Sequence, residues 1–279
     1  NQAVFERQSS VNSESLYVLK GKSAWLATAF CSFILLIAFV IPIAVLINYA
    51  ITYFDKAWNV EFFSYAWQSL KVAGVVSVIT ITLSVFVVFY QRVAKQAYPL
   101  IPGRLASTGY ALPGTVLAIA VLLPLTLLEN TINTALEKYN LDIGLLLTGS
   151  ILTIIIAYIV RFYAIAHGAI ESSFLRISPS LDMASQSMGK SQGQTLRLVH
   201  LPLLRRGLLT AALLVFIECM KELPAALLLR PFNFESLATH VFQYVSDEQL
   251  ELASISALFI VIVGFIPLYF INRSMEQHT

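Results

Sequence analysis

DMASQSMGKSQGQTLRLVHLP, residues 182–202, is a polar segment that lies between two long apolar ones. Just before it, Ser178 offers a hydroxyl suited to an N-cap, and Pro179 offers a pre-set first helical residue. Gly189 suits the left-handed position that commonly follows the end of a helix. A short helix is therefore expected from about Pro179 to Met188.

A second short helix is expected just after the glycine. Ser191 and Gln194 have the Ser-x-x-Gln spacing of a capping box, in which each side chain bonds to the backbone N–H of the other residue. Pro202 has no N–H and is expected to stop this helix. The sequence thus predicts a hairpin of two short helices that are joined at Gly189 and face water.

The composition places the rest of the chain in a membrane. Of the 279 residues, 57% are hydrophobic and only 12% are charged, which is too little polar surface for a soluble domain of this length. Cys31 and Cys219 lie far apart in separate apolar runs, and the histidines are scattered, so no disulfide framework or metal site is indicated. The sequence contains no complete nucleotide-binding motif and no nucleic-acid patch.

Long apolar runs define the expected fold class, which is all-α. A helix needs about 20 apolar residues to cross the hydrocarbon core, and the sequence contains about six such runs. We therefore expect a polytopic membrane helical bundle of about six transmembrane helices with the polar hairpin outside the membrane. The expected spans are 23–51, 69–90, 107–128, 144–166, 207–230 and 251–271.

The basic residues predict how this bundle is oriented. They concentrate on one side of the alternating spans, whereas the loops on the other side are rich in acidic residues. Because basic loops remain in the cytoplasm, the hairpin and both ends of the sequence are expected to be cytoplasmic. The basic side contains Lys20, Lys22, Arg92, Lys95, Arg104, Arg176, Lys190, Arg197, Arg205, Arg206 and Arg273.

The hairpin resembles the EAA loop of ABC-importer permeases. The family pattern reads, in order, an acidic residue, two alanines, any three residues and a glycine. Any nine residues follow, and the pattern ends with an aliphatic residue, any residue, an aliphatic residue and a proline. Here Asp182 stands one position before the acidic residue, Met183 takes the acidic position, and Ser185 replaces the second alanine. The positions that match the family pattern are Ala184, Gly189, Val199, Leu201 and Pro202.

The resemblance implies a role for the hairpin in coupling to ATP. Its first helix would be the coupling helix, which docks in a groove of a cytoplasmic ATPase subunit in this family. ATP and Mg²⁺ would be bound by that partner, and this chain would be a transport subunit without a cofactor of its own and not an enzyme. An ordinary amphipathic loop between membrane helices is the alternative.

The third expected span contains, near its start, the segment ALPGTVLA, residues 111–118. Its Pro113–Gly114 pair is expected to bend or interrupt the helix. The interruption could be a kink that improves packing or a hinge that moves. The segment also resembles the corresponding part of the ferric-iron group of ABC permeases.

The fifth expected span is unusual because it contains charged residues, in FIECMKELPAALLLRPFNF, residues 216–234. Glu218 has i,i+3 and i,i+4 spacings to Lys221 and Glu222, which would place all three on one helical face. Charges are costly in hydrocarbon, so this face is expected to line a cavity, with Pro224 interrupting the helix nearby. These four residues are the candidate translocation pathway, and an internal structural ion pair is the alternative.

The segment KELPAALLLRPFNFESLATHVFQYVSDEQ, residues 221–249, also resembles the ferric-iron permeases. The resemblance implies a bacterial inner-membrane protein that receives ferric iron from a periplasmic binding protein and passes it between two homologous permease halves. Permeases for putrescine, sulfate, molybdate and thiamine share the loop pattern. Because the ferric-iron permeases are often fused duplicates and the sequence begins at Asn1, we expect it to be the C-terminal half of a longer chain.

The expected organisation is a type I ABC-importer permease. Residues 1–22 would be a cytoplasmic linker, 23–273 the transmembrane domain with its EAA-type loop at 178–202, and 274–279 a tail. Two other classes remain open. One is an ion-coupled secondary transporter that uses Glu218, Lys221 and Glu222 to carry an ion or proton. The other is a structural subunit of a membrane enzyme.

Overall fold

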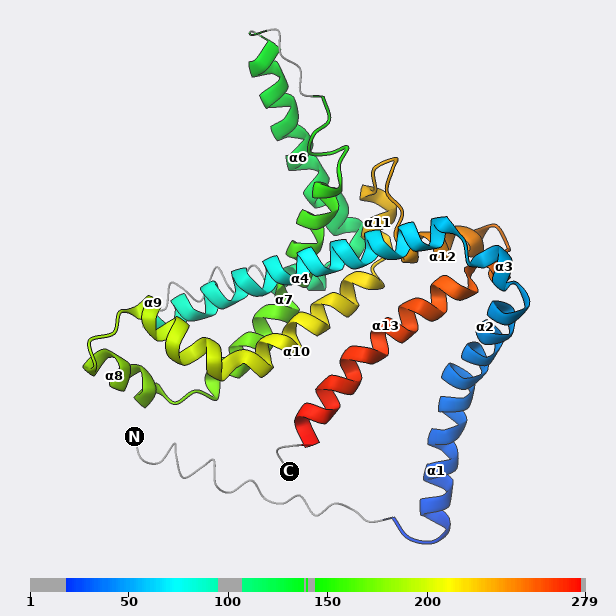
Figure 1. The fold of residues 1–279 in the computed structure, drawn as a ribbon, viewed down its shortest axis with the longest axis horizontal. Helices are drawn as coiled ribbons and strands as arrows, with labels where there is room; N and C mark the ends of the chain where they lie inside the picture. The colour runs from blue at the N-terminus through cyan, green and yellow to red at the C-terminus, as the bar shows by residue number, and fades with distance from the viewer. Residues whose placement is uncertain (1–18, 95–106, 138, 140–143, 277–279) are drawn as a thin grey trace. The chain divides into compact units, whose positions relative to one another are not determined.

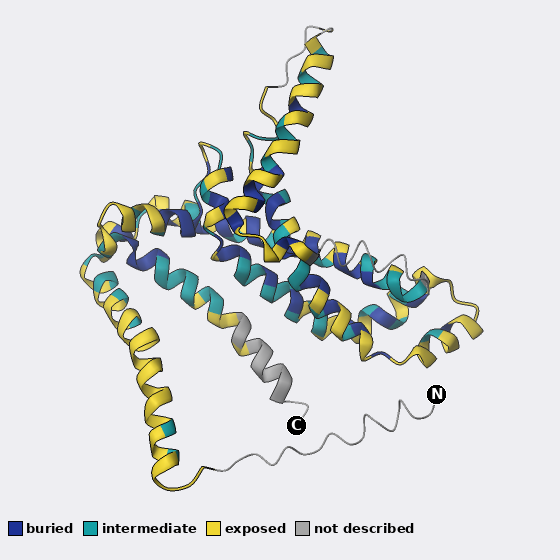
Figure 2. Ribbon diagram, turned by 180° about the vertical axis from the view of Figure 1, so that it is seen from behind, coloured by how far each residue is buried: buried dark blue, intermediate teal, exposed yellow. Residues whose placement is uncertain are grey.

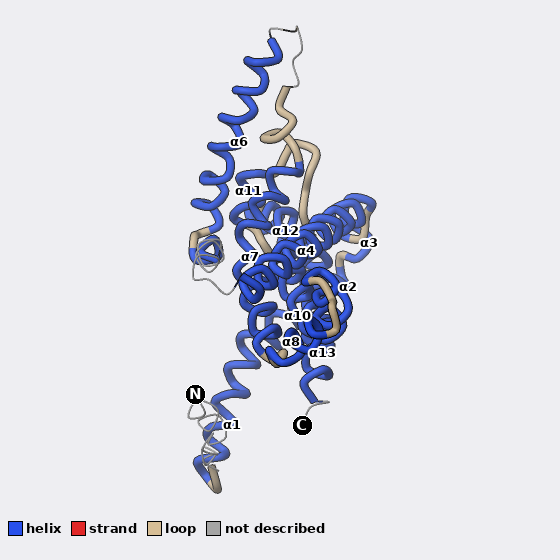
Figure 3. The backbone as a smooth tube through the Cα atoms, turned by 90° about the vertical axis from the view of Figure 1, so that its left-hand side faces the viewer, coloured by secondary structure: helices blue, strands red, loops and turns tan. Residues whose placement is uncertain are grey.

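The computed structural model of this chain describes residues 19–94, 107–137, 139 and 144–276. Every regular element in these ranges is a helix, as the tube drawing shows (Figure 3). The chain divides into two units, residues 1–48 and residues 49–279, and each unit is described separately. The all-α class expected from the sequence is confirmed.

In the first unit, the described residues from Lys22 onward form one apolar helical stretch. It contains α1 (Lys22–Leu35) and a π-helical turn, η2 (Leu36–Val40), and α2 (Ile41–Thr52) begins within it. The combined stretch, Lys22–Thr52, is long and apolar enough to cross a membrane. Pro42 lies inside it without ending the helix, because the preceding π turn opens the backbone hydrogen-bond ladder where the proline lacks an N–H.

The second unit contains the remaining helices, and Figure 1 labels the α-helices among them. Its elements are α3 (Phe54–Ala57), α4 (Val60–Ala94), η3 (Ser107–Ala111), α6 (Gly114–Glu137), α7 (Ile151–Leu175), α8 (Pro179–Ser187), α9 (Gln192–Thr195), η4 (Leu196–His200), α10 (Leu201–Met220), α11 (Pro224–Leu229), α12 (Leu237–Ser246) and α13 (Leu250–Glu276).

The core of the second unit lies where α4, α7 and α10 pack against one another. Val76, Ala157 and Val215 contribute one fully buried side chain from each of these helices, and Figure 2 shows the buried residues in dark blue. Around this core, α12 packs on α13 and α11 packs on α6. Small residues such as Ala73 and Ala211 are buried as well, which lets the helix backbones approach closely.

Some helices begin at residues other than those expected from the apolar runs, because caps or tertiary contacts determine where these helices start. The third helix, α6, starts at Gly114 because the residues before Pro113 form a separate 3₁₀ turn, so the predicted interruption is confirmed. The fourth, α7, starts only at Ile151, where the Ser150 side chain accepts a hydrogen bond from Leu152. Upstream, the buried Glu129 carboxylate accepts the backbone N–H groups of 147 and 148.

Candidate functional site

The helical hairpin forms with the caps that the sequence predicts. Ser178 accepts a hydrogen bond from the Ser180 N–H at the start of α8, and α8 ends before Gly189, whose φ is +72°. At the start of α9 the capping box is complete: the Ser191 N–H donates to Gln194 Oε1 at 2.9 Å, and the Gln194 N–H donates to Ser191 Oγ at 3.3 Å. The two-helix hairpin is therefore confirmed.

The prediction that Pro202 stops the second helix is wrong. The chain passes from α9 through the π turn η4 into α10, and Pro202 lies in the first turn of α10. The wider π turn opens the hydrogen-bond ladder where proline has no N–H to donate, as η2 does before Pro42. One continuous helical path therefore connects the hairpin to Met220.

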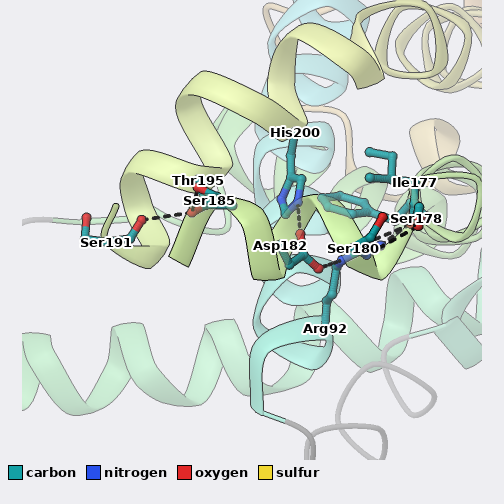
Figure 4. A network of polar contacts seen from close by, with 10 residues as sticks. Arg92, Ile177, Ser178, Ser180, Asp182, Ser185, Ser191, Thr195 and His200 are labelled. Atoms are coloured by element: carbon teal, nitrogen blue, oxygen red, sulfur yellow. Dashed lines mark hydrogen bonds and ion pairs between the residues drawn. The ribbon is translucent and has the colours of Figure 1, made fainter. Parts of the chain in front are cut away.

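Arg92, near the end of α4, holds the hairpin in place (Figure 4). Its Nε donates to Asp182 Oδ2 at 2.7 Å. Its two terminal nitrogens donate to the carbonyls of Phe174, at 2.8 Å, and Ile177, at 2.9 Å. The last carbonyls of a helix have no partner within the helix, so one guanidinium caps the end of α7 and binds α8 at the same time.

Asp182 also pairs with His200, at the junction of η4 and α10. His200 Nε2 lies 2.6 Å from Asp182 Oδ1, and its ring contacts those of Phe89 and Phe174. Burial raises the pKa of Asp182, but the hydrogen bonds from Arg92 and His200 outweigh that effect and hold this pKa below its ordinary value. The carboxylate therefore joins α4 and α8 to the junction of η4 and α10.

The other predicted coupling residues lie around this anchor. A bond of 2.7 Å between the Ser185 and Thr195 hydroxyls ties α8 to α9. Val199 and Leu201 are half-buried. The remaining residues predicted to take part in coupling are exposed: Ala184, Gly189 and Pro202.

Apolar side chains cover part of the outer surface of the hairpin. Met183, which occupies the acidic position of the family pattern, is 61% exposed, and Met188 and Leu198 are exposed as well. Asp182 faces inward to its two partners, whereas this outer surface is available to another protein.

The charged residues near the end of α10 do not share one helical face, and that expectation is wrong. The helix ends at Met220, and Lys221 is its C-cap. Lys221 Nζ lies 2.8 Å from Glu218 Oε1, and the Lys221 side chain is 56% exposed. The Glu222 side chain is only 7% exposed. Pro224 is the first residue of α11, a position where the N–H that proline lacks has no partner within the helix, so the break falls before it.

Glu222 pairs instead with Arg161, which the analysis of the sequence missed. Arg161 Nε lies 3.0 Å from Glu222 Oε2, and Arg161 also donates to the Leu112 carbonyl at 3.0 Å. The Tyr158 hydroxyl donates to the Glu222 carbonyl at 3.1 Å. A Cβ added to Gly114 would lie 2.7 Å from Glu222 Oε1, so the carboxylate could keep this position only beside a glycine and would have to shift for any larger residue. A lone arginine inside the apolar helix α7 was the available signal.

This cluster brings two sequence motifs together. ALPGTVLA supplies Leu112 and Gly114, and the KELP segment supplies Glu222 and Pro224. Glu222 Oε1 also accepts the Ala225 N–H at 3.2 Å, which fixes the first turn of α11. The starts of α6 and α11 are thus held together on α7.

The long apolar helices and the anchored polar hairpin define a membrane transport subunit of the permease class. Residues 102–279 match the family model described as binding-protein-dependent transport system inner membrane component, and the chain belongs to this family. It is therefore an inner-membrane component of a transport system.

Two curated relatives are ferric permeases by name. Over 251 residues the chain is 27% identical to the Fe(3+)-transport system permease protein FbpB 2 of Haemophilus influenzae, covering 89% of this chain and 47% of that protein. Over 122 residues it is 32% identical to the ferric transport system permease protein FbpB of Actinobacillus pleuropneumoniae. This match covers 44% of this chain and 18% of that protein. The chain therefore spans less than half of the length of either relative.

Solved structures support the fold. A chain of the bacterial alginate ABC transporter, crystallised with its alginate-bound periplasmic protein, is 15% identical with a TM-score of 0.69, covering 91% of this chain and 95% of that chain. A chain of the MetNI methionine ABC transporter is 17% identical with a TM-score of 0.54. This match covers 78% of this chain and 96% of that chain. The expected importer-permease fold is confirmed.

Proposed function

We propose that this chain is one permease half of an ATP-driven importer that carries ferric iron across a bacterial inner membrane. The anchoring of the hairpin is the observation that carries this proposal. Arg92, Asp182 and His200 join α8 to α4 and α10, so a force on the hairpin moves long helices of the bundle. A hairpin that only linked two spans would not need a partly buried ionic anchor.

The exposed apolar surface of the hairpin is where a cytoplasmic ATPase subunit would dock. Met183, Met188 and Leu198 offer side chains that a groove of that subunit can cover. In this arrangement the partner binds ATP and Mg²⁺ and hydrolyses ATP, and this chain has no catalytic role. The hairpin and both ends of the described segment then lie in the cytoplasm, in agreement with their basic residues.

The translocation pathway would run between this chain and a second permease half, fused or separate. Glu218 and Lys221 are accessible beside the break between α10 and α11, where they can meet cargo. Glu222 and Pro224 would shape that break, with Glu222 held by Arg161. Ferric iron is proposed as cargo because the relatives named above are ferric permeases and the KELP segment resembles theirs.

The test is uptake of radioactive ferric iron by vesicles that contain the complete transporter and its binding protein. ATP-dependent uptake that an uncoupler does not reduce, with an ATPase that co-purifies with the chain, is the expected result. Uptake that needs no ATPase and stops with uncoupler would identify an ion-coupled secondary transporter instead. Uptake of another cargo but not iron would retain the importer and reject the ferric assignment.

A further inference from the structure

A cavity of about 460 Å³ opens where the end of α7 meets the start of α8 and the first turns of α10. The helices approach closely beside it, because a Cβ added to Gly207 would lie 2.2 Å from Ser173 Oγ. Its lining combines basic, hydroxyl and aliphatic side chains: Ser173, Arg176, Ile177, Ser178, Leu181, Leu203, Leu204, Arg206 and Gly207.

The polar part of this lining suits a phosphate group. Arg176 is the C-cap of α7, and Arg206 comes from α10, so two guanidinium groups border the cavity from different helices. Ser178 is the N-cap of α8, and the N-terminal end of that helix carries a partial positive charge. Among the described residues that line the cavity none is acidic. Guanidinium and hydroxyl donors with a helix N-terminus match the oxygens of a phosphate.

The position of the cavity favours a lipid as the source of that phosphate. The apolar helix α7 ends at Leu175, one residue before Arg176, and the apolar part of α10 begins just after Arg206. Both arginines thus lie at the boundary between water and hydrocarbon, where phospholipid headgroups lie. Leu175 and Leu203 are exposed at the same level and can contact acyl chains.

We propose that this cavity binds the phosphate headgroup of an anionic phospholipid. The bound headgroup would contact the N-cap of α8, the helix that carries the coupling residues, through Ser178. Anionic lipid would then stabilise the start of the hairpin from the membrane side. This inference depends on the cavity and not on the cargo.

Native mass spectrometry of the complete transporter, purified from nanodiscs that contain phosphatidylglycerol and phosphatidylcholine, tests the proposal. The double variant Arg176→Gln/Arg206→Gln removes both cavity guanidiniums. The matched control is Arg197→Gln/Arg205→Gln, which removes two exposed arginines of the same region that do not line the cavity. Because the cavity variant loses both guanidinium contacts to the one phosphate, it should bind phosphatidylglycerol at least about tenfold more weakly.

The control should retain the lipid as the unmodified protein does. Equal retention by the cavity variant, or an equal loss in the control, would overturn the proposal, since the lipid would then bind elsewhere or respond only to total charge. Inorganic phosphate added in millimolar excess should not displace the lipid. Displacement by inorganic phosphate would show a site for soluble phosphate and would also overturn the lipid assignment. Circular dichroism of both variants checks that they are folded.

Discussion

At the scale of single residues, glycines decide the geometry of the hairpin and of the charged cluster, for two different reasons. Gly189 has a φ of +72°, yet no atom lies within 4 Å of a Cβ built on it. Its requirement for glycine is therefore conformational. Gly114 has ordinary backbone angles, but an added Cβ would meet Glu222 and Pro224. Its requirement is steric.

Substitution Gly189→Val is expected to uncouple ATP hydrolysis from transport while the bundle stays folded. A side chain in the left-handed region costs about 1–2 kcal/mol, more for a β-branched residue, so the angle between α8 and α9 should change. Gly193→Ala is the control, because Gly193 lies inside α9 with open space around it. Transport and ATP hydrolysis are measured together in the reconstituted transporter. Normal uptake per ATP by Gly189→Val would disprove this.

Substitution Gly114→Ala is expected to displace Glu222 from Arg161 and to lower both stability and transport. The added methyl would lie 2.7 Å from Glu222 Oε1 and 3.0 Å from Pro224 Cβ, and overpacking of this kind costs about 1–3 kcal/mol. Thermal unfolding in detergent measures the effect. Gly168→Ala, in open space within α7, should leave the melting temperature unchanged or raise it. Equal melting temperatures for both variants would show that the cluster adapts.

At the scale of the elements, two ion pairs beside the α10–α11 break should behave in opposite ways. Arg161 and Glu222 are largely buried, so Glu222→Gln alone leaves an unpaired buried charge that costs about 3–5 kcal/mol. The double variant Arg161→Met/Glu222→Gln should recover most of this stability. A double-mutant cycle of unfolding free energies measures the coupling. Additive losses in the double variant would show that the two residues act independently.

The pair of the exposed Lys221 and the half-buried Glu218 is expected to matter for transport and little for stability. An exposed ion pair contributes only about 0–1 kcal/mol, so Lys221→Met with Glu218→Gln should reach the membrane in normal amounts. If these side chains guide a cation, uptake should nevertheless fall. We would measure membrane abundance and substrate uptake for both single variants and for the double variant. These measurements decide whether the pair acts in transport. A double variant that transports at the unmodified rate would leave this pair a structural role only.

Local signals in the sequence predict some elements well and miss others for physical reasons. The caps at Ser178 and Ser191 depend on neighbours within three residues, so their positions follow from the sequence. The continuation of the helix through Pro202 depends on a π turn, which no short motif announces. The partner of Glu222 could not be predicted because Arg161 is distant in sequence and meets it only in the folded bundle.

At the scale of the whole second unit, α4 links the hairpin to the opposite end of the bundle. It has 35 residues, so as a helix it extends over about 50 Å. Arg92 holds the hairpin near one end, while near the other end Gln68 accepts the Glu235 N–H and Ser69 accepts the Leu237 N–H at the start of α12. Movement of the hairpin should therefore reach α12 through a single rigid helix.

The stability that Asp182 contributes where it anchors the hairpin to α4 should decrease as the pH falls. Because the pKa of Asp182 is lower in the folded protein than its ordinary value of 3.8, its ionised form stabilises the fold. That stability is fully present above pH 3.8 and is lost as the pH falls through the lower folded pKa. The difference in unfolding free energy between the unmodified chain and Asp182→Asn should thus shrink on acidification. A difference that stays constant below pH 3.8 would contradict this.

The π turn of residues 196–200 has a consequence for how this chain tolerates insertions and deletions. A π turn holds one residue more than an α-helical turn, so the segment contains, in effect, one inserted residue. Deleting one residue there would close the turn to α-helical geometry and leave the hairpin at nearly the same rotation relative to α10, because both kinds of turn make about one revolution. Deleting a residue within α10, where the turns are already α-helical, would instead rotate the hairpin by about 100° relative to the rest of that helix. The number of residues in α10 therefore fixes the direction in which the hairpin faces, and a deletion of one residue there would turn it away from Arg92 on α4.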